Sequence, residues 1–88
     1  MIYMISFDPH KGDATALHNV IENSQLLINW WHYIGSTYLV KSNYGARTIQ
    51  DEIAEKWPQQ RFLVIKVDPT SYGGWLPQKA WDWIARQA

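Results

Sequence analysis

The chain has 88 residues, which is enough for one small domain whose hydrophobic core is barely sufficient on its own. Its 8 basic residues balance 8 acidic ones, which argues against a general DNA or RNA coat, because such proteins carry a basic excess. The lack of cysteine excludes disulfides, thiolate metal sites and cysteine nucleophiles. The apolar N-terminal run is too short for a signal peptide or membrane span, so we expect a cytoplasmic protein without a membrane partner.

The first half of the chain predicts a strand, a helix and a hairpin. Residues 2–7 are β-branched and aromatic and end at Asp8-Pro9, which is typical of a strand. Apolar residues at three- and four-residue steps predict a helix over 14–24. Residues 26–33 and 37–42 read as two strands that a tight turn at Gly35 joins.

The second half predicts a helix, a strand and a terminal helix. Residues 45–57 place Ala46, Ile49, Ile53 and Trp57 on one face, and Pro58 ends this helix. Residues 61–67 are predicted to form a strand. A last helix is predicted over 75–87, with Pro77 in its first turn and with Trp81, Ile84 and Ala85 on one side.

This order predicts one α+β domain with the ferredoxin-like βαββαβ arrangement, a four-stranded antiparallel sheet and an appended C-terminal helix. The core spans 1–70 and a tryptophan-rich tail spans 71–88. Both faces of the strands at 2–7 and 61–67 are largely apolar, while two helices cover only one face. We therefore expect a homodimer through the open sheet face.

The adjacent Trp30 and Trp31 must point to opposite faces of a regular strand, so they cannot form one flat platform. One is expected in the helix-covered core, and the other on the dimer face or in solvent. His32 shares the face of Trp30. A base can stack on such an indole, but packing is the commoner role for each tryptophan.

Four segments make the chain resemble a known group: ISFD, WWHYIGSTYLVK, IQDEI followed by FLVIKV, and GWLPQKAWDWI. The chain resembles small ferredoxin-like proteins related to the CRISPR-associated adaptation protein two and to virulence-associated protein D. It is closest to their short uncharacterised branch, often labelled "SinR family". The resemblance spans nearly the whole chain.

The resemblance implies a dimer whose sheets face each other. It also implies that Asp8, at the end of the first strand, meets its symmetry mate there. In characterised relatives this pair is assigned to divalent-metal binding and phosphodiester cleavage. That role implies Mg²⁺ or Mn²⁺ as the cofactor and makes Asp8 both a metal ligand and a catalytic residue. This sequence departs from the pattern in its zero net charge and in its helical tail, where relatives carry a crossing strand.

Other polar residues are candidates around Asp8. His10 is a candidate acid or base near neutral pH, and Lys11 a candidate phosphate ligand, although a solvated loop explains both. The further candidates for binding a nucleotide or phosphate are Trp31, His32, Ser36, Thr37 and Arg47. Hydroxyls at a turn usually bond neighbouring backbone, and Arg47 can equally belong to a solvated surface.

Three functions remain open from the sequence. The first is a homodimer that binds RNA, DNA or a nucleotide, acting as a metal-dependent endoribonuclease through paired Asp8. The second is a non-enzymatic module that captures a small nucleotide or nucleotide signal, which the neutral charge and aromatic excess favour. The third is a structural partner in a CRISPR, toxin–antitoxin or phage-defence complex.

Overall fold

The computed structural model describes residues 1–8 and 14–87, and these contain the predicted elements in the predicted order. The strands are β1 (Ile2–Phe7), β2 (Leu27–Ile34), β3 (Thr37–Ser42) and β4 (Phe62–Val67). The helices are α1 (Ala14–Asn23), α2 (Ala46–Lys56) and α3 (Gln78–Gln87). The largest difference from prediction is at the last helix, which begins at Gln78 because Pro77 only supplies the carbonyl that accepts from the Ala80 amide, at 2.9 Å.

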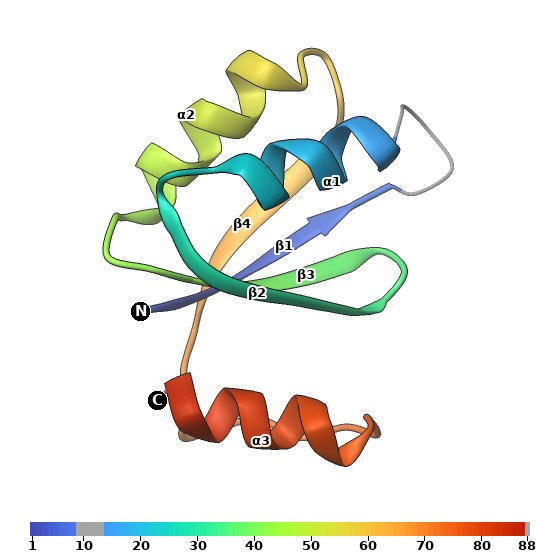
Figure 1. Cartoon of the computed structure of the whole chain (residues 1–88), viewed down its shortest axis with the longest axis vertical. Coiled ribbons are helices and arrows are strands. Elements are labelled where there is room, and N and C mark those ends of the chain that lie inside the picture. The colour runs from blue at the N-terminus through green and yellow to red at the C-terminus, as the bar shows by residue number, and fades with distance from the viewer. Residues whose placement is uncertain (9–13, 88) are drawn as a thin grey trace.

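The four strands form one antiparallel sheet in the order β2-β3-β1-β4, which is the ferredoxin-like arrangement. Figure 1 shows α1 and α2 together on one side of the sheet and α3 alone on the other. The molecule therefore has three layers, with the sheet in the middle. Within residues 1–8 and 14–87, no helix is long and apolar enough to cross a membrane.

The main core lies between the sheet and the first two helices, as the sequence predicts. Tyr3, Ile5 and Phe7 of β1 point into it, and each is at most 6% exposed. The predicted apolar stripes supply the other side of this core; the buried helix residues are Leu17, Ile21, Ile49, Ile53 and Trp57. Because alternate strand residues face opposite sides, Ile2 and Met4 must point away from this core.

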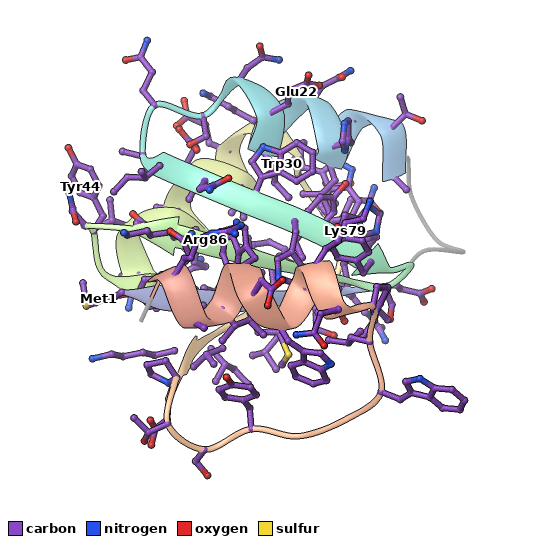
Figure 2. All side chains as sticks on the ribbon, turned by 60° about the horizontal axis from the view of Figure 1, so that its bottom comes forward. Met1, Glu22, Trp30, Tyr44, Lys79 and Arg86 are labelled. Carbon is purple, nitrogen blue, oxygen red and sulfur yellow. The ribbon has the colours of Figure 1, made fainter. Side chains whose placement is uncertain are left out.

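The opposite face is covered in part by α3 of the same chain (Figure 1). The sequence predicts a second copy over this face, and it leaves open whether the tryptophan-rich tail packs across its own sheet or onto that partner. Figure 2 shows α3 lying across the strands. A second buried cluster joins the helix to Ile2, Trp31 and Leu39 of three different strands. The chain thus buries much of its own second face, and a dimer is not needed for that part of it.

The buried stripe of α3 differs from the predicted one. Ala80, Trp83 and Ile84 are buried, whereas Trp81 is half-buried and Ala85 is exposed. The indole of Trp81 instead stacks on Tyr72 of the preceding loop, with ring centroids 5.6 Å apart. The helix is rotated toward Trp83 because this side chain packs edge-on against Trp31, with centroids 6.4 Å apart.

Two polar atoms are left without partners in this second cluster. Within the described chain, the buried indole nitrogens of Trp31 and Trp83 make no hydrogen bond. Each such N–H costs about 1–3 kcal/mol of folding free energy relative to a satisfied one. Apolar packing therefore stabilises the contact between α3 and the sheet, and it must outweigh the cost of burying these two N–H groups.

We predict that Trp83→Ala lowers the free energy of unfolding by about 3–5 kcal/mol, because it empties the centre of the second cluster. Trp83→Phe should cost less, since it keeps a ring and removes an unsatisfied N–H. Urea denaturation measures both effects. Trp75→Ala is the matched control, because Trp75 is 98% exposed. A Trp83→Ala protein as stable as the wild type would contradict the packing of α3 on its own sheet.

Candidate functional site

The end of β1 brings Asp8 beside the start of β4. Phe7 pairs with Phe62 and Ser6 with Leu63, so the chain leaves the sheet at Asp8 next to the point where Arg61 enters it. A shallow hollow opens on this surface, lined by Ser6, Phe7, Asp8, Arg61, Phe62 and Leu63. Its lining residues are an aspartate, an arginine and a serine beside three apolar residues.

The turn between β2 and β3 lies at the same end of the sheet. The Phe7 amide donates to the Ser36 carbonyl at 3.0 Å, and Thr37 pairs with Ser6 in the ladder between β3 and β1. Ser36 and Thr37 are both half-buried. Three of the predicted site residues, Asp8, Ser36 and Thr37, are therefore brought to one end of the sheet by strand pairing.

This end can provide oxygen ligands and a phosphate donor, but it does not contain a complete metal site. Among residues 1–8 and 14–87, no three side chains of histidine, aspartate or glutamate lie close enough together to hold an ion. His10 and Lys11 lie outside the described residues. A hard cation such as Mg²⁺ is usually held by one or two carboxylates and several waters, which Asp8 fits as a single ligand.

Arg47 is placed elsewhere. It lies in the first turn of α2 and lines a second shallow groove with Gln50 and Val64. This groove shares Phe62 and Leu63 with the hollow beside Asp8, but Arg47 does not line that hollow. Its guanidinium lies 3.7 Å from Asp51, with 87% of the arginine side chain exposed. An exposed pair of this kind contributes at most about 1 kcal/mol, so Arg47 behaves as part of a solvated helix surface.

The adjacent tryptophans are split between the two faces, as the two-residue period predicts. Trp30 packs on the side of α1, 5.2 Å from the His18 ring, whereas Trp31 lies beneath α3 and is 6% exposed. A base could stack on Trp31 only if α3 moved away. The structure gives no support to Trp31 as a nucleotide platform in this arrangement.

His32 faces the helix side, where it joins a cluster that the sequence analysis did not identify. Its ring stacks on Tyr38 at a centroid distance of 4.0 Å, and its Nε2 lies 3.1 Å from the Gly35 carbonyl. His18 of α1 contacts the same tyrosine, with Nδ1 2.8 Å from the hydroxyl oxygen. Two histidines therefore contact one buried phenol from different directions.

A hydrogen-bonded chain runs from this phenol to solvent. The Nε2 of His18 lies 3.4 Å from the Glu22 carboxylate, one helical turn further along α1. With the proton on Nε2, His18 donates to Glu22 and accepts from the Tyr38 hydroxyl. Figure 2 shows Glu22 and Trp30 on the same side of the molecule, above the strand β2.

Burial raises the pKa of the Tyr38 hydroxyl, and the negative charge of Glu22 raises it further. The (i, i+4) spacing of His18 and Glu22 was visible in the sequence. The link to Tyr38 was not, because it depends on how α1 lies across β3. This cluster stabilises the packing of α1, since it joins the helix to the centre of the sheet.

Comparison with known proteins finds no relative for this chain: no protein-family model, no curated protein and no solved structure matches it.

We predict that Tyr38→Phe flattens the alkaline limb of the stability curve. A raised folded-state pKa means that the neutral hydroxyl stabilises the fold below the ordinary value of 10.0, and that this contribution is lost as pH rises through the folded pKa. The wild type should therefore lose stability above about pH 10 more steeply than the variant. At neutral pH the variant should lose about 1 kcal/mol with the hydrogen bond to His18.

The measurement is urea unfolding at a series of pH values, with Tyr33→Phe as the control because Tyr33 is 45% exposed. If Tyr38→Phe and Tyr33→Phe gave the same alkaline profile, the burial of the Tyr38 hydroxyl and the raised pKa that follows from it would be contradicted.

Proposed function

We propose that the chain is a homodimeric protein that binds the phosphate of RNA or of a nucleotide at the hollow beside Asp8. The single observation that supports this best is the presence of Asp8, Arg61 and Ser6 around one surface hollow. The hydroxyls of Ser36 and Thr37 lie at the same end of the sheet, one strand away. Together these groups offer both donors and acceptors to a phosphodiester.

Arg61 has the chemistry of the phosphate ligand at this site. Its guanidinium presents a planar fork of N–H donors that matches two phosphate oxygens. It directly precedes β4 and is exposed, so a ligand can reach it without any movement of the core. From the sequence alone, Arg61 is one of several basic residues that could contact a phosphate or belong to a solvated surface. Its proximity to Asp8 depends on the pairing of β1 with β4.

Asp8 has the chemistry of the metal ligand. A Mg²⁺ or Mn²⁺ ion on this carboxylate would neutralise the charge of a bound phosphate and lower the pKa of a coordinated water. With that ion, the proposed activity is endoribonuclease cleavage. Asp8 would hold the ion, while Arg61 would orient the phosphodiester and stabilise the charge that develops on it.

A second candidate is a module that binds a small nucleotide without cleaving it. The described chain contributes one carboxylate to this hollow, whereas two-metal phosphodiesterases need several. Zero net charge also suits a small ligand better than a long polymer, whose binding depends on many phosphate contacts. Both candidates use Arg61, and only the first requires Asp8.

We predict that Asp8→Asn lowers the rate of cleavage of a short single-stranded RNA in Mn²⁺ by about 100-fold or more, because the amide no longer holds the ion. RNA binding should persist in this variant. Arg61→Gln should weaken binding by about tenfold or more, since it removes a charge-assisted contact. Arg47→Gln is the matched control, because this arginine is exposed and does not line the hollow beside Asp8.

Fluorescence anisotropy measures the binding and gel electrophoresis the cleavage. If the wild type binds a nucleotide through Arg61 but cleaves no RNA in any divalent metal, the binding module is the correct candidate. If Arg61→Gln and Arg47→Gln are equally without effect on binding, the hollow beside Asp8 is not the site.

A further inference from the structure

The strand β4 is a regular edge strand whose outer side pairs with no other strand of the described chain. Its six residues follow β1 in an unbroken register from Phe7–Phe62 to Ile2–Val67. It contains no proline and no bulge. Regular edges of this kind are templates for pairing with another chain, and proteins usually protect them.

The opposite edge of the sheet is protected. The ladder between β2 and β3 shifts register twice, between Leu27 and Asn29 and again between Trp31 and Ile34. Such irregularities twist a strand and interrupt its row of free backbone groups. The two edges therefore differ, and only β4 is suited to accept a further strand.

The side chains of β4 also have uncovered apolar surface. Leu63 and Ile65 pair with Ser6 and Met4 of β1, so they share the sheet face on which α3 packs. Yet Leu63 is 54% exposed and Ile65 is 43% exposed. The cluster beneath α3 reaches β4 at Val67 but leaves Leu63 and Ile65 open beside the free edge.

We propose that a second copy of the chain pairs its β4 antiparallel with this β4, about a two-fold axis at Val64. The two sheets then form one continuous sheet of eight strands. The pairing is isologous, since each copy offers the same edge. This edge-to-edge dimer goes beyond the proposed function, and its formation does not depend on a bound phosphate or nucleotide.

The register follows from the alternation of side chains. A two-fold axis that joins two equal edges is perpendicular to the sheet, so opposite residues must point to the same face. Centring the axis on Val64 places Leu63 opposite the partner's Ile65, and Ile65 opposite the partner's Leu63. The four exposed apolar side chains then form one strip across the axis.

The neighbouring registers are less favourable. An axis at Leu63 places Ile65 opposite the partner's Arg61, and an axis at Ile65 places Phe62 opposite the partner's Asp68. Only the register centred on Val64 sets both Leu63 and Ile65 opposite exposed apolar side chains of the partner. It also sets Phe62 opposite the partner's Lys66, and Arg61 opposite the partner's Val67.

The contact borders the hollow. Arg61 lines the hollow and, in this register, lies opposite the partner's Val67. Each hollow therefore opens beside the junction of the two sheets.

This dimer differs from the face-to-face dimer expected from the sequence. From the strand spacing and the rise per residue, the two Asp8 residues lie about 25 Å apart rather than meeting at the axis. Each copy has its own hollow. Cross-linking can separate the two arrangements, because the natural chain has no cysteine that would interfere.

The test introduces single cysteines and oxidises the full-length protein. Val64→Cys should form a disulfide-linked dimer, because opposite residues of antiparallel strands have Cα atoms within the range that a disulfide spans. A mixture of Leu63→Cys and Ile65→Cys should cross-link, whereas neither should do so alone. Asn29→Cys, on the protected edge, is the control and should show no disulfide-linked dimer on a non-reducing gel.

Sedimentation of a second variant tests the same contact without cysteine. Ile65→Lys should sediment as a monomer, whereas the wild type should sediment as a dimer. Ile28→Lys is the matched control: Ile28 is also exposed, at 57%, but it lies on the other edge, so this variant should remain a dimer. Circular dichroism checks that both variants fold. A monomeric wild type would overturn the proposal, and so would a dimer in which Asp8→Cys cross-links with itself while Val64→Cys does not.

Discussion

Both faces of β1 are apolar, and this constraint determines how the rest of the molecule is built. Tyr3, Ile5 and Phe7 require cover on one side, while Ile2 and Met4 require it on the other. A ferredoxin-like domain has helices for one side only. The chain covers the second side with its own tail, because α3 brings Trp83 onto Trp31 and Leu39.

The cover that α3 provides is incomplete, and the uncovered parts are where function is proposed. The helix leaves Leu63 and Ile65 exposed along β4, and the hollow beside Asp8 opens next to Leu63. Interior packing therefore explains Trp31, Trp57 and Trp83, whereas the proposed sites lie at one end and one edge of the sheet. Binding and assembly at these places would not disturb either core.

The sequence predicted the elements well, because period and turn residues are local. It also split Trp30 from Trp31 correctly, since a strand allows nothing else. It could not place α3, because an amphipathic stripe says that a helix is buried but not against which surface. The contacts of Tyr38 with His18, and of Arg61 with the Asp8 hollow, depend on helix placement and strand register, which single-sequence patterns leave open.

The claim that the end of β1 is the functional site can be tested directly by adding Mn²⁺ to isotope-labelled protein and recording amide resonances. The account predicts paramagnetic broadening centred on Asp8 that also reaches Ser6 and Arg61, and that disappears in Asp8→Asn. Broadening centred instead on exposed acids such as Glu22 or Asp51, or the same broadening in Asp8→Asn, would contradict it.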